Sequence, residues 1–360
     1  MTCAFELAKL GYAPVVFESL PKPGGMLRVG IPDYRLPKNI LDEEIKWILC
    51  AGIKIKTNTR IGKDIKFKAL LKKYRATFIA VGAHSGYRLG IPGEDKNGVA
   101  EGIGFLRNLN LGKKQKVGNV IAIIGGGNVA IDAARSSLRS DAKKVYIIYR
   151  RTKSEMPAME EEIEEAIKEG IEIIYLASPK RILGENGKVE GIECLQMELG
   201  DYDESGRRKP MPIKSSEFTL EVDMVIPAIG QKTDFSFLPE ELQSPDKINW
   251  RTLATPLSGV FMGGDCRTGP ATAIEAIAAG KKAAKNIDKF LRGEKIEEVK
   301  IFVERPPKRK RVEEPSSLYH QRIAVLPLSQ RKNFKEVELG LTKTKAKLEA
   351  TRCLRCDLEE

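Results

Sequence analysis

The first residues of the chain alternate apolar and polar positions at the spacing of an amphipathic helix. Apolar side chains gather on one side of residues 1–10, and Gly11 ends the pattern. The apolar run 15–17 is typical of a short strand, and it ends at an acidic residue, Glu18. A helix followed by such a strand is the second half of a dinucleotide-binding βαβ unit. Because the chain starts at Met1, we expect the first strand and the glycine-rich phosphate loop of this unit to be missing.

A complete βαβ pattern occupies the middle of the chain. Residues 120–124 are apolar and mostly β-branched, residues 128–139 continue as a helix, and residues 145–149 form a second apolar strand. Together with the incomplete unit at the start, this pattern predicts a duplicated nucleotide-binding architecture.

Small residues follow the first strand of the complete unit at the spacing G-x-G-x-x-A: Gly125, Gly127 and Ala130. Gly125 allows a tight turn, Gly127 lets the backbone approach a pyrophosphate, and Ala130 lets the helix pack close to the strand. The helix N-terminus then supplies N–H groups for the phosphates. We therefore predict a nucleotide site here rather than an ordinary glycine turn.

The second strand of this unit ends in Arg150 and Arg151, where an NAD site usually carries Asp or Glu. A guanidinium suits a ribose 2′-phosphate by its charge and its fork of donors, so we favour NADPH over NADH. The alternative is that both arginines are solvated residues at a strand end.

A third pattern lies near residue 260, where an apolar run leads into Gly263, Gly264 and Asp265. A helix is expected to begin near residues 271–272. An aspartate at a strand end can hydrogen-bond a polyol, and the next helix N-terminus can stabilise an electron-rich ring edge. The alternative is a plain strand–helix turn.

Composition narrows the class of protein. The hydrophobic fraction of 42% and charged fraction of 31% are those of a globular chain, long enough at 360 residues for two domains. We find no membrane-spanning apolar run and no secretory signal, so we expect a cytoplasmic protein that does not contact the membrane. The net charge of +12 favours anionic ligands or acidic partners, but an aromatic fraction of 6% argues against nucleic acid.

Histidine is scarce, since only His84 and His320 occur. We assign no catalytic role to either of them. The sequence also shows no nucleophile elbow and no metal-ligand motif in its core, so we predict neither a catalytic side chain nor a bound metal there.

Six stretches between residues 1 and 292 are long and specific: "KPGGMLRVGIPDYRLPK", "FIAVGAHSGYRLGIPGED", "IIGGGNVAIDAAR", "YRRTKSEMPA", "VDMVIPAIGQKTD" and "GGDCRTGPATAIEAIAAGKKAA". Together they resemble the NADPH-oxidising flavoprotein family of the glutamate synthase small (beta) subunit. The matching domains of dihydropyrimidine dehydrogenase belong to the same family.

The resemblance implies an α/β fold of two interleaved dinucleotide-binding (Rossmann-like) domains and an extended C-terminal tail. Residues 1–105 and 233–292 would form an FAD-binding domain that is incomplete at its N-terminus. Residues 106–232 would form the NAD(P)H-binding domain, and residues 293–360 a basic tail that ends in C-x-x-C.

The same resemblance implies which residues hold the cofactors. Glu18 would bind the adenosine ribose of FAD, and Asp265 would bind its ribityl chain. The residues implied for FAD are Glu18, Gly24, Gly25, Met26, Arg35, Gly264, Asp265, Thr268, Gly269, Ala271 and Thr272. Those implied for NADPH are Gly125, Gly127, Asn128, Val129, Ala130, Arg150, Arg151, Ala228, Ile229 and Gly230.

In activity, the resemblance implies an FAD-dependent NAD(P)H dehydrogenase that serves as an electron-input subunit. A hydride would pass from NADPH to FAD, and single electrons would leave to an iron–sulfur or large catalytic subunit, or to a ferredoxin-like protein. Two alternatives stay open. One is an NAD(P)H:ferredoxin-type oxidoreductase, and the other is a non-catalytic NADPH-binding or scaffold subunit that has lost FAD.

Cys353 and Cys356 lie in "LEATRCLRCDLEE", which resembles the opening of the iron–sulfur domain of the family's small subunits. A cubane cluster usually takes four thiolates, so two cannot complete one without ligands from a partner chain. Three interpretations stay open: a remnant or docking tail, a cluster or metal site shared with a partner, and a redox disulfide.

Overall fold

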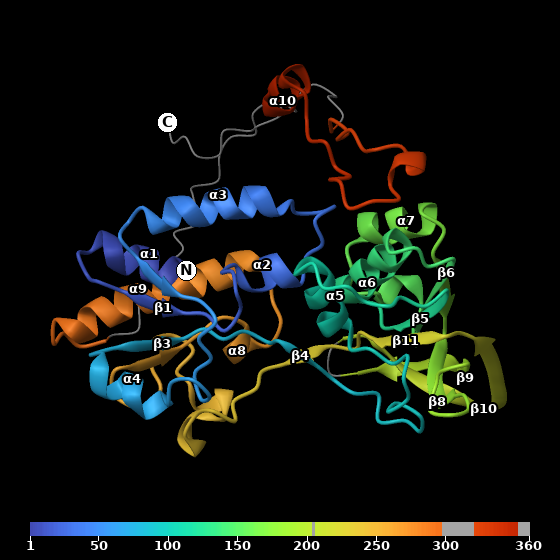
Figure 1. Cartoon of the computed structure of the whole chain (residues 1–360), viewed down its shortest axis with the longest axis horizontal. Coiled ribbons are helices and arrows are strands. Elements are labelled where there is room, and N and C mark those ends of the chain that lie inside the picture. Colours follow the sequence, from blue (N-terminus) through green and yellow to red (C-terminus); the bar gives the residue numbers. More distant parts are fainter. Residues whose placement is uncertain (204–205, 297–319, 352–360) are drawn as a thin grey trace.

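The computed structural model describes residues 1–203, 206–296 and 320–351. Cys353, Cys356 and the basic cluster 308–311 lie outside the described residues. The described chain forms two α/β halves that lie side by side (Figure 1). Across these three stretches, no helix combines the length and the apolar content needed to cross a bilayer.

The right-hand half in Figure 1 is built on a parallel sheet with the strand order β11-β5-β6-β7. Its strands are β5 Val120–Ile124, β6 Lys144–Tyr149, β7 Glu172–Tyr175 and β11 Met224–Pro227. Ile121, Ala122 and Ile123 of β5 are completely buried. The strands predicted at residues 120–124 and 145–149 are confirmed, the second with one more residue at its start.

Helices cover one face of this sheet, and antiparallel strands cover the other. The helices are α5 Gly102–Asn110, α6 Asn128–Arg139 and α7 Glu160–Lys168. The antiparallel sheet consists of β8 Ala177–Leu183, β9 Gly191–Tyr202 and β10 Arg208–Glu221. Each face therefore has its own apolar core, and the predicted helix at residues 128–139 coincides with α6.

The left-hand half is built from shorter parallel strand pairs. β1 (Val15–Phe17) pairs with β2 (Lys54–Lys56), and β3 (Thr77–Ile79) pairs with β13 (Val260–Met262). Because β3 and β13 are far apart in the sequence, this half is discontinuous in the chain. Its helices are α1 Thr2–Lys9, α2 Gly25–Val29, α3 Lys38–Leu49, α4 Phe67–Lys73, α8 Asp265–Thr268 and α9 Ala273–Leu291. The helix and strand predicted at the start of the chain are confirmed as α1 and β1.

Short 3₁₀ helices lie in both halves and in the tail, at Lys153–Glu155, Glu240–Leu242, Pro245–Lys247 and Leu328–Gln330. The chain crosses between the halves at β4 (Ser85–Gly86) and β12 (Gln231–Lys232), which pair antiparallel. Beside this pair, the Gln231 side-chain amide donates to the Ala83 carbonyl at 3.2 Å. This strand pair therefore links the two halves. The domain boundaries given above stay a prediction.

A buried ion-pair cluster joins the halves; its members are Arg35, Asp132, Arg135, Arg139, Glu162, Glu169 and Arg331. Arg35, in the loop after α2, lies 2.9 Å from Asp132 of α6 and 3.2 Å from Glu162 of α7. The buried hydroxyl of Tyr34 donates to Asp132 at 3.2 Å. Burial raises the pKa of Asp132 to about 6, although Arg35 acts in the opposite direction. The charge of Asp132 therefore depends on a residue from the other half.

Glu169 lies just after α7 and accepts hydrogen bonds from two arginines of α6. The carboxylate is 2.7 Å from Arg135 and 2.6 Å from Arg139, and all three side chains are almost fully buried. Burial alone would raise the pKa of Glu169, but the bonds from Arg139 and Arg135 outweigh it and hold the pKa at about 2. Glu169 therefore stays ionised and ties α6 to the end of α7.

The described part of the C-terminal tail runs beside α7 (Figure 1), and its Arg331 joins this cluster. Arg331 is 6% exposed and forms an ion pair with Glu165 of α7. The N–H of Val337 donates to the carbonyl of Tyr34 at 2.9 Å. The tail thus contacts both halves at their junction before it reaches α10 (Lys343–Ala350).

Glu169→Gln removes the charge that Arg135 and Arg139 share. We expect the free energy of unfolding to fall by about 3 to 5 kcal/mol, because two guanidinium groups stay buried without their anion. The pKa of Glu169 is lowered from 4.5 to about 2 in the fold, so its stabilisation is complete above pH 4.5 and is lost as the pH falls towards 2. Urea unfolding of the two proteins at about pH 7 and about pH 3 measures this difference and its decrease.

The matched control is Glu161→Gln, on the exposed side of the same helix. We expect it to change the free energy of unfolding by less than about 0.5 kcal/mol. An effect of Glu169→Gln no larger than that of the control would contradict the role of Glu169 in the cluster.

Candidate functional site

The loop between β5 and α6 runs close to the end of the neighbouring strand β11. Gly125 has a φ of +144°, and a Cβ there would collide with the carbonyl oxygen of Ala228. Asn128 begins α6 and is exposed, so the N-terminus of this helix is open at the surface. A helix N-terminus presents free N–H groups and a positive dipole end, which together suit a phosphate group.

Residues implied for the pyrophosphate and for the nicotinamide half of NADPH lie together at this edge of the sheet. The N–H of Ala228 donates to the carbonyl of Ile124 at 2.8 Å, which keeps the end of β11 beside the glycine loop. The group consists of Gly125, Gly127, Asn128, Val129, Ala130, Ala228, Ile229 and Gly230. This proximity is what a bound dinucleotide requires, and the roles of the individual residues stay predictions.

Arg150 and Arg151, both predicted to hold a 2′-phosphate, have different surroundings. Arg150 is exposed directly after β6. Arg151 is only 3% exposed, and its guanidinium donates to the carbonyl of Arg208 at 2.7 Å and to the carboxylate of Asp203 at 2.6 Å. Arg151 therefore braces the hairpin formed by β9 and β10, and its contact with a 2′-phosphate stays a prediction.

Glu18 follows β1, as predicted. Its N–H donates to the carbonyl of Lys56 at 2.9 Å, which extends the contact between β1 and β2. One oxygen of its carboxylate accepts the N–H of Leu20 at 2.8 Å, so the side chain is held over the turn that follows the strand. The position at the end of a parallel strand is the one that a ribose-binding carboxylate occupies.

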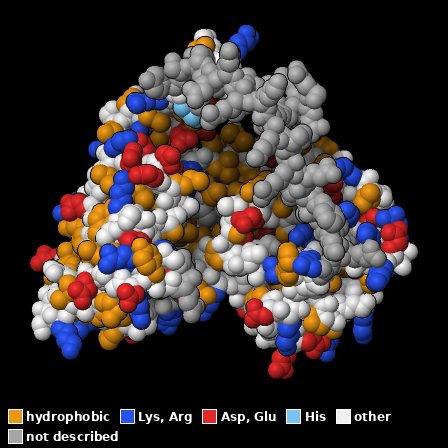
Figure 2. All heavy atoms as spheres, turned by 180° about the vertical axis from the view of Figure 1, so that it is seen from behind, with side chains coloured by type: hydrophobic (Ala, Val, Ile, Leu, Met, Phe, Trp, Pro, Cys, Tyr) orange, Lys and Arg blue, Asp and Glu red, His pale blue; other side chains and the backbone are white. Residues whose placement is uncertain are grey.

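Gly24, Gly25 and Met26 form the start of α2, where Gly24 has a φ of +131°. The sulfur of Met26 lies 4.0 Å from the side-chain nitrogen of Gln231, the residue after Gly230. The turn implied for FAD therefore meets the segment implied for the nicotinamide end of NADPH. Figure 2 shows the face where the molecule is hollowed between its halves, with hydrophobic side chains in the hollow.

The turn after β13 contains α8, a four-residue helix where we predicted only a turn. Asp265 begins α8, and burial raises the pKa of its carboxyl, although a bond from the backbone of Ala271 acts in the opposite direction. Thr272 caps α9 and accepts the N–H of Glu275 at 3.4 Å, so the predicted helix start is confirmed. The remaining residues implied for FAD in this turn are Gly264, Thr268 and Gly269.

Arg35, which the resemblance placed on FAD, points into the ion-pair cluster. Its guanidinium is paired with Asp132 and Glu162, and 23% of the side chain is exposed. Arg35 therefore links the two halves, and its contact with FAD stays a prediction. The signal that we missed was the charge pattern of α6, where Asp132, Arg135 and Arg139 lie at i, i+3 and i+7 and so share one side of the helix.

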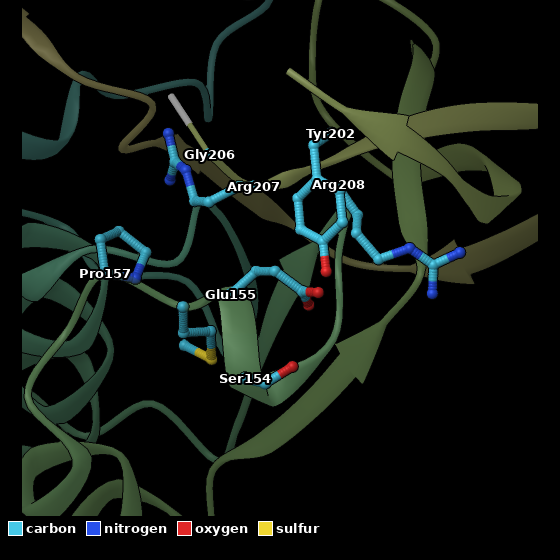
Figure 3. Close-up of a pocket in the computed structure, with 8 residues that line it drawn as sticks. Ser154, Glu155, Pro157, Tyr202, Gly206, Arg207 and Arg208 are labelled. Atoms are coloured by element: carbon cyan, nitrogen blue, oxygen red, sulfur yellow. The ribbon is translucent and has the colours of Figure 1, made fainter. Parts of the chain in front are cut away.

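An open cleft of about 600 Å³ lies between the loop after β6 and the hairpin (Figure 3). It is lined by Ser154, Glu155, Met156, Pro157, Tyr202, Gly206, Arg207 and Arg208. We predicted none of these residues. The sequence carries two signals for them: residues 154–157 lie in the stretch "YRRTKSEMPA", and residues 207–209 form a basic run at the start of a strand-forming segment.

Acid–base groups are few near the site. Burial, together with the charge of Arg107, lowers the pKa of His84 to about 4, so its imidazole is neutral near pH 7. In residues 1–203, 206–296 and 320–351, no group of three His, Cys, Asp or Glu side chains is placed to hold a metal ion. What the site offers is backbone and polar side chains suited to binding and orienting nucleotides.

The discontinuous half, the complete glycine loop and the contact between the two predicted cofactor groups define the class of two-domain dinucleotide-binding oxidoreductases. The chain belongs to the pyridine nucleotide-disulphide oxidoreductase family, whose model matches residues 1–280. The resemblance to proteins like the glutamate synthase small subunit is thereby confirmed, because relatives with that name are similar to the chain.

Three relatives illustrate the similarity. The chain is 42% identical to the NADP(+)-dependent formate dehydrogenase subunit beta of Moorella thermoacetica, over 99% of the chain and 53% of that protein. It is 37% identical to the NADPH-Fe(3+) oxidoreductase subunit beta of Geobacter sulfurreducens, over 99% and 59%. It is 32% identical to the glutamate synthase [NADPH] small chain of Escherichia coli, over 81% and 66%. The chain thus spans only about half to two thirds of the length of these relatives.

Solved structures share the fold. FprA from Mycobacterium tuberculosis, in complex with NADPH, has a TM-score of 0.69 at 20% identity, over 81% of this chain and 83% of that one. Thioredoxin reductase from Lactococcus lactis has a TM-score of 0.61 at 19% identity, over 81% and 95%. The predicted fold class, α/β with two dinucleotide-binding domains, is therefore confirmed.

Gly125→Ala tests the close approach of the glycine loop to β11. We expect the free energy of unfolding to fall by roughly 2 to 4 kcal/mol, because the new Cβ adds a steric collision with Ala228 to an unfavourable φ. Gly112→Ala is the matched control, since Gly112 also has a positive φ, +71°, but open space around it. We expect a loss of about 1 kcal/mol there by urea unfolding. Equal losses in the two variants would contradict the collision.

Proposed function

We propose that this chain is the FAD-dependent, NADPH-oxidising part of an electron-input subunit. The observation that supports it most is a contact between the halves: Met26, which is implied for FAD, lies beside Gln231, the residue directly after the segment implied for NADPH. Two nucleotide cofactors that lie in separate α/β halves can bring their reactive rings together only at such a junction.

On the FAD side, Glu18 would bind the adenosine ribose and Asp265 the ribityl chain. Both positions fit: Glu18 stands at a strand end, and Asp265 lies in the turn between β13 and α9. Gly24, Gly25 and Met26 would line the flavin, and the remaining contacts would come from Gly264, Thr268, Gly269, Ala271 and Thr272.

On the NADPH side, the N-terminus of α6 would bind the pyrophosphate, through Gly127, Asn128, Val129 and Ala130. Residues 228–230 would lie close to the nicotinamide half of the cofactor. Arg150 is exposed at the strand end where a ribose 2′-phosphate would lie, which favours NADPH over NADH.

When bound, the nicotinamide supplies a hydride to the flavin, a step that takes no proton from the protein. The chain's own residues bind and orient the cofactors and keep water out. His84 is neutral near pH 7, which is consistent with this step because the step needs no acidic side chain. The four described cysteines, Cys3, Cys50, Cys194 and Cys266, are free thiols, so the described residues supply no disulfide as electron acceptor.

Electrons would leave to an iron–sulfur or large catalytic subunit, or to a ferredoxin-like protein. The relatives' names support a role as one subunit among several, since they are called subunit beta or small chain. The net charge of +12 would favour an acidic electron-transfer partner. The described residues hold no iron–sulfur site of their own, so any cluster used would involve other residues or a partner chain.

Purification of the chain with added FAD tests the proposal. We expect a yellow protein whose flavin band is bleached by NADPH under anaerobic conditions, and more slowly by NADH. A colourless protein that binds NADP⁺ but cannot be reconstituted with FAD would contradict the proposal and favour the non-catalytic NADPH-binding subunit.

Asp265→Asn tests the ribityl contact. Losing a charge-assisted bond is expected to weaken FAD binding roughly tenfold, measured by the release of flavin fluorescence on dilution. The control is Asp201→Asn, at an exposed position of β9 in the other half, which should leave FAD binding unchanged. Equal FAD affinity in the two variants would argue against this role for Asp265.

A further inference from the structure

The cleft beside the hairpin lies next to the glycine loop between β5 and α6. A Cβ on Gly127 would lie 3.9 Å from Pro157, which lines the cleft. The N–H of Ala158 donates to the carbonyl of Gly126 at 3.2 Å, and that of Met159 donates to the Asn128 side chain at 3.2 Å. The loop that forms one wall is therefore fastened to the pyrophosphate end of the site.

The cleft also lies where the adenosine end of a dinucleotide belongs. In a βαβ unit the pyrophosphate lies at the helix N-terminus, and the adenosine ribose lies at the end of the second strand. That strand is β6, and the cleft-lining residues 154–157 follow it after only a few positions. The second wall comes from a different element, the hairpin of β9 and β10.

Arg151 fixes this second wall. Its guanidinium holds the carboxylate of Asp203 and the carbonyl of Arg208, so both strands of the hairpin are tied to the end of β6. Asp203 and Arg207 also pair through their backbones, with the N–H of Asp203 donating to Arg207 at 2.8 Å. The described residues on either side of the turn, Tyr202, Asp203, Arg207 and Arg208, are therefore held beside the cleft.

Arg208 does not point into the cleft. Its guanidinium donates to the carbonyls of Leu199 at 2.5 Å and Gly200 at 3.2 Å, and Figure 3 shows it extending away. Arg207 lies on the Pro157 side, and the ring of Tyr202 stands beside it from the same hairpin (Figure 3). Tyr202 is a large aromatic residue that is 76% exposed.

We infer that the hairpin closes on the adenosine end of NADPH: the ring of Tyr202 stacks on the adenine, and Arg207 binds the ribose 2′-phosphate. An exposed aromatic face is a platform for any base, and a guanidinium fork matches a phosphate dianion. The inference rests on the proposed function and deepens it, because it assigns the choice of NADPH over NADH to Arg207 as well as Arg150.

The acid in the cleft is compatible with this arrangement. The carboxylate of Glu155 accepts the N–H of Thr152 at 3.1 Å and points toward the Tyr202 hydroxyl in Figure 3. It lies away from the Pro157 side, where Arg207 would meet the phosphate. The charge of Arg151 is balanced by Asp203, while Arg150 is exposed at the end of β6 and Arg207 lines the cleft.

Calorimetric titration of the purified full chain with NADP⁺ and, separately, with NAD⁺ tests the inference. For Arg207→Ala we expect the Kd of NADP⁺ to rise roughly 10- to 100-fold, and the Kd of NAD⁺ to change less than about twofold. For Tyr202→Ala we expect both Kd values to rise about tenfold or more, while Tyr202→Phe keeps them within about twofold. Lys209→Ala is the matched control: it removes one positive charge two residues further along, outside the cleft, and should change either Kd less than about twofold.

Three results would overturn the inference. Arg207→Ala could weaken the binding of NADP⁺ and of NAD⁺ equally, which would show that Arg207 does not bind the 2′-phosphate. The unmodified chain could bind NADP⁺ and the variants could bind it equally well. This result would refute the role of the hairpin in NADPH binding but would leave the proposed function standing. The unmodified chain could bind neither nucleotide, which refutes both. Unchanged urea midpoints in the variants show that a lost affinity is not lost folding.

Discussion

Buried charges need their partners, and this constraint sets how the two halves of the molecule meet. Arg135, Arg139 and Glu169 are almost completely removed from water, so each is stable only beside the others. Arg35 extends the same cluster into the other half through Asp132. The junction therefore has a defined geometry, whereas a purely apolar contact of the same size could slide.

Helix α6 connects this cluster to the nucleotide site. Its first turn follows the glycine loop, and its later turns carry Asp132, Arg135 and Arg139. A helix is a stiff element, so the loop that would bind a pyrophosphate is positioned by the ion pairs that hold the other half. The tail strengthens the connection, since Arg331 reaches α7 while Val337 bonds to the loop of Tyr34. The distance between two bound cofactor rings would depend on these contacts, and hydride transfer is sensitive to such distances.

Local patterns in the sequence predicted the elements, and long-range contacts decided the side chains. The bounds of β5 and α6 follow from a run of apolar residues and the spacing of Gly125 and Gly127, which are local signals. The helix α8 was missed because four residues carry no periodicity. The ion-pair partners of Arg35 and Arg151 were not predicted, because Asp132 and Asp203 lie 97 and 52 residues away, and no sequence pattern of one chain reveals such a pairing.

The ion pair of Arg151 also bears on the proposed preference for a phosphorylated ribose. Two adjacent arginines at a strand end suggest that both bind the 2′-phosphate, but Asp203 neutralises one of them. The neutralised arginine is not lost to the site, because it holds the hairpin that carries Arg207. A charge brought in on a second element approaches the phosphate from another direction than Arg150, and two cations on separate elements define a position better than two on one strand. Selectivity would then depend on the hairpin being in place, which makes the buried Arg151 a positioning residue for it.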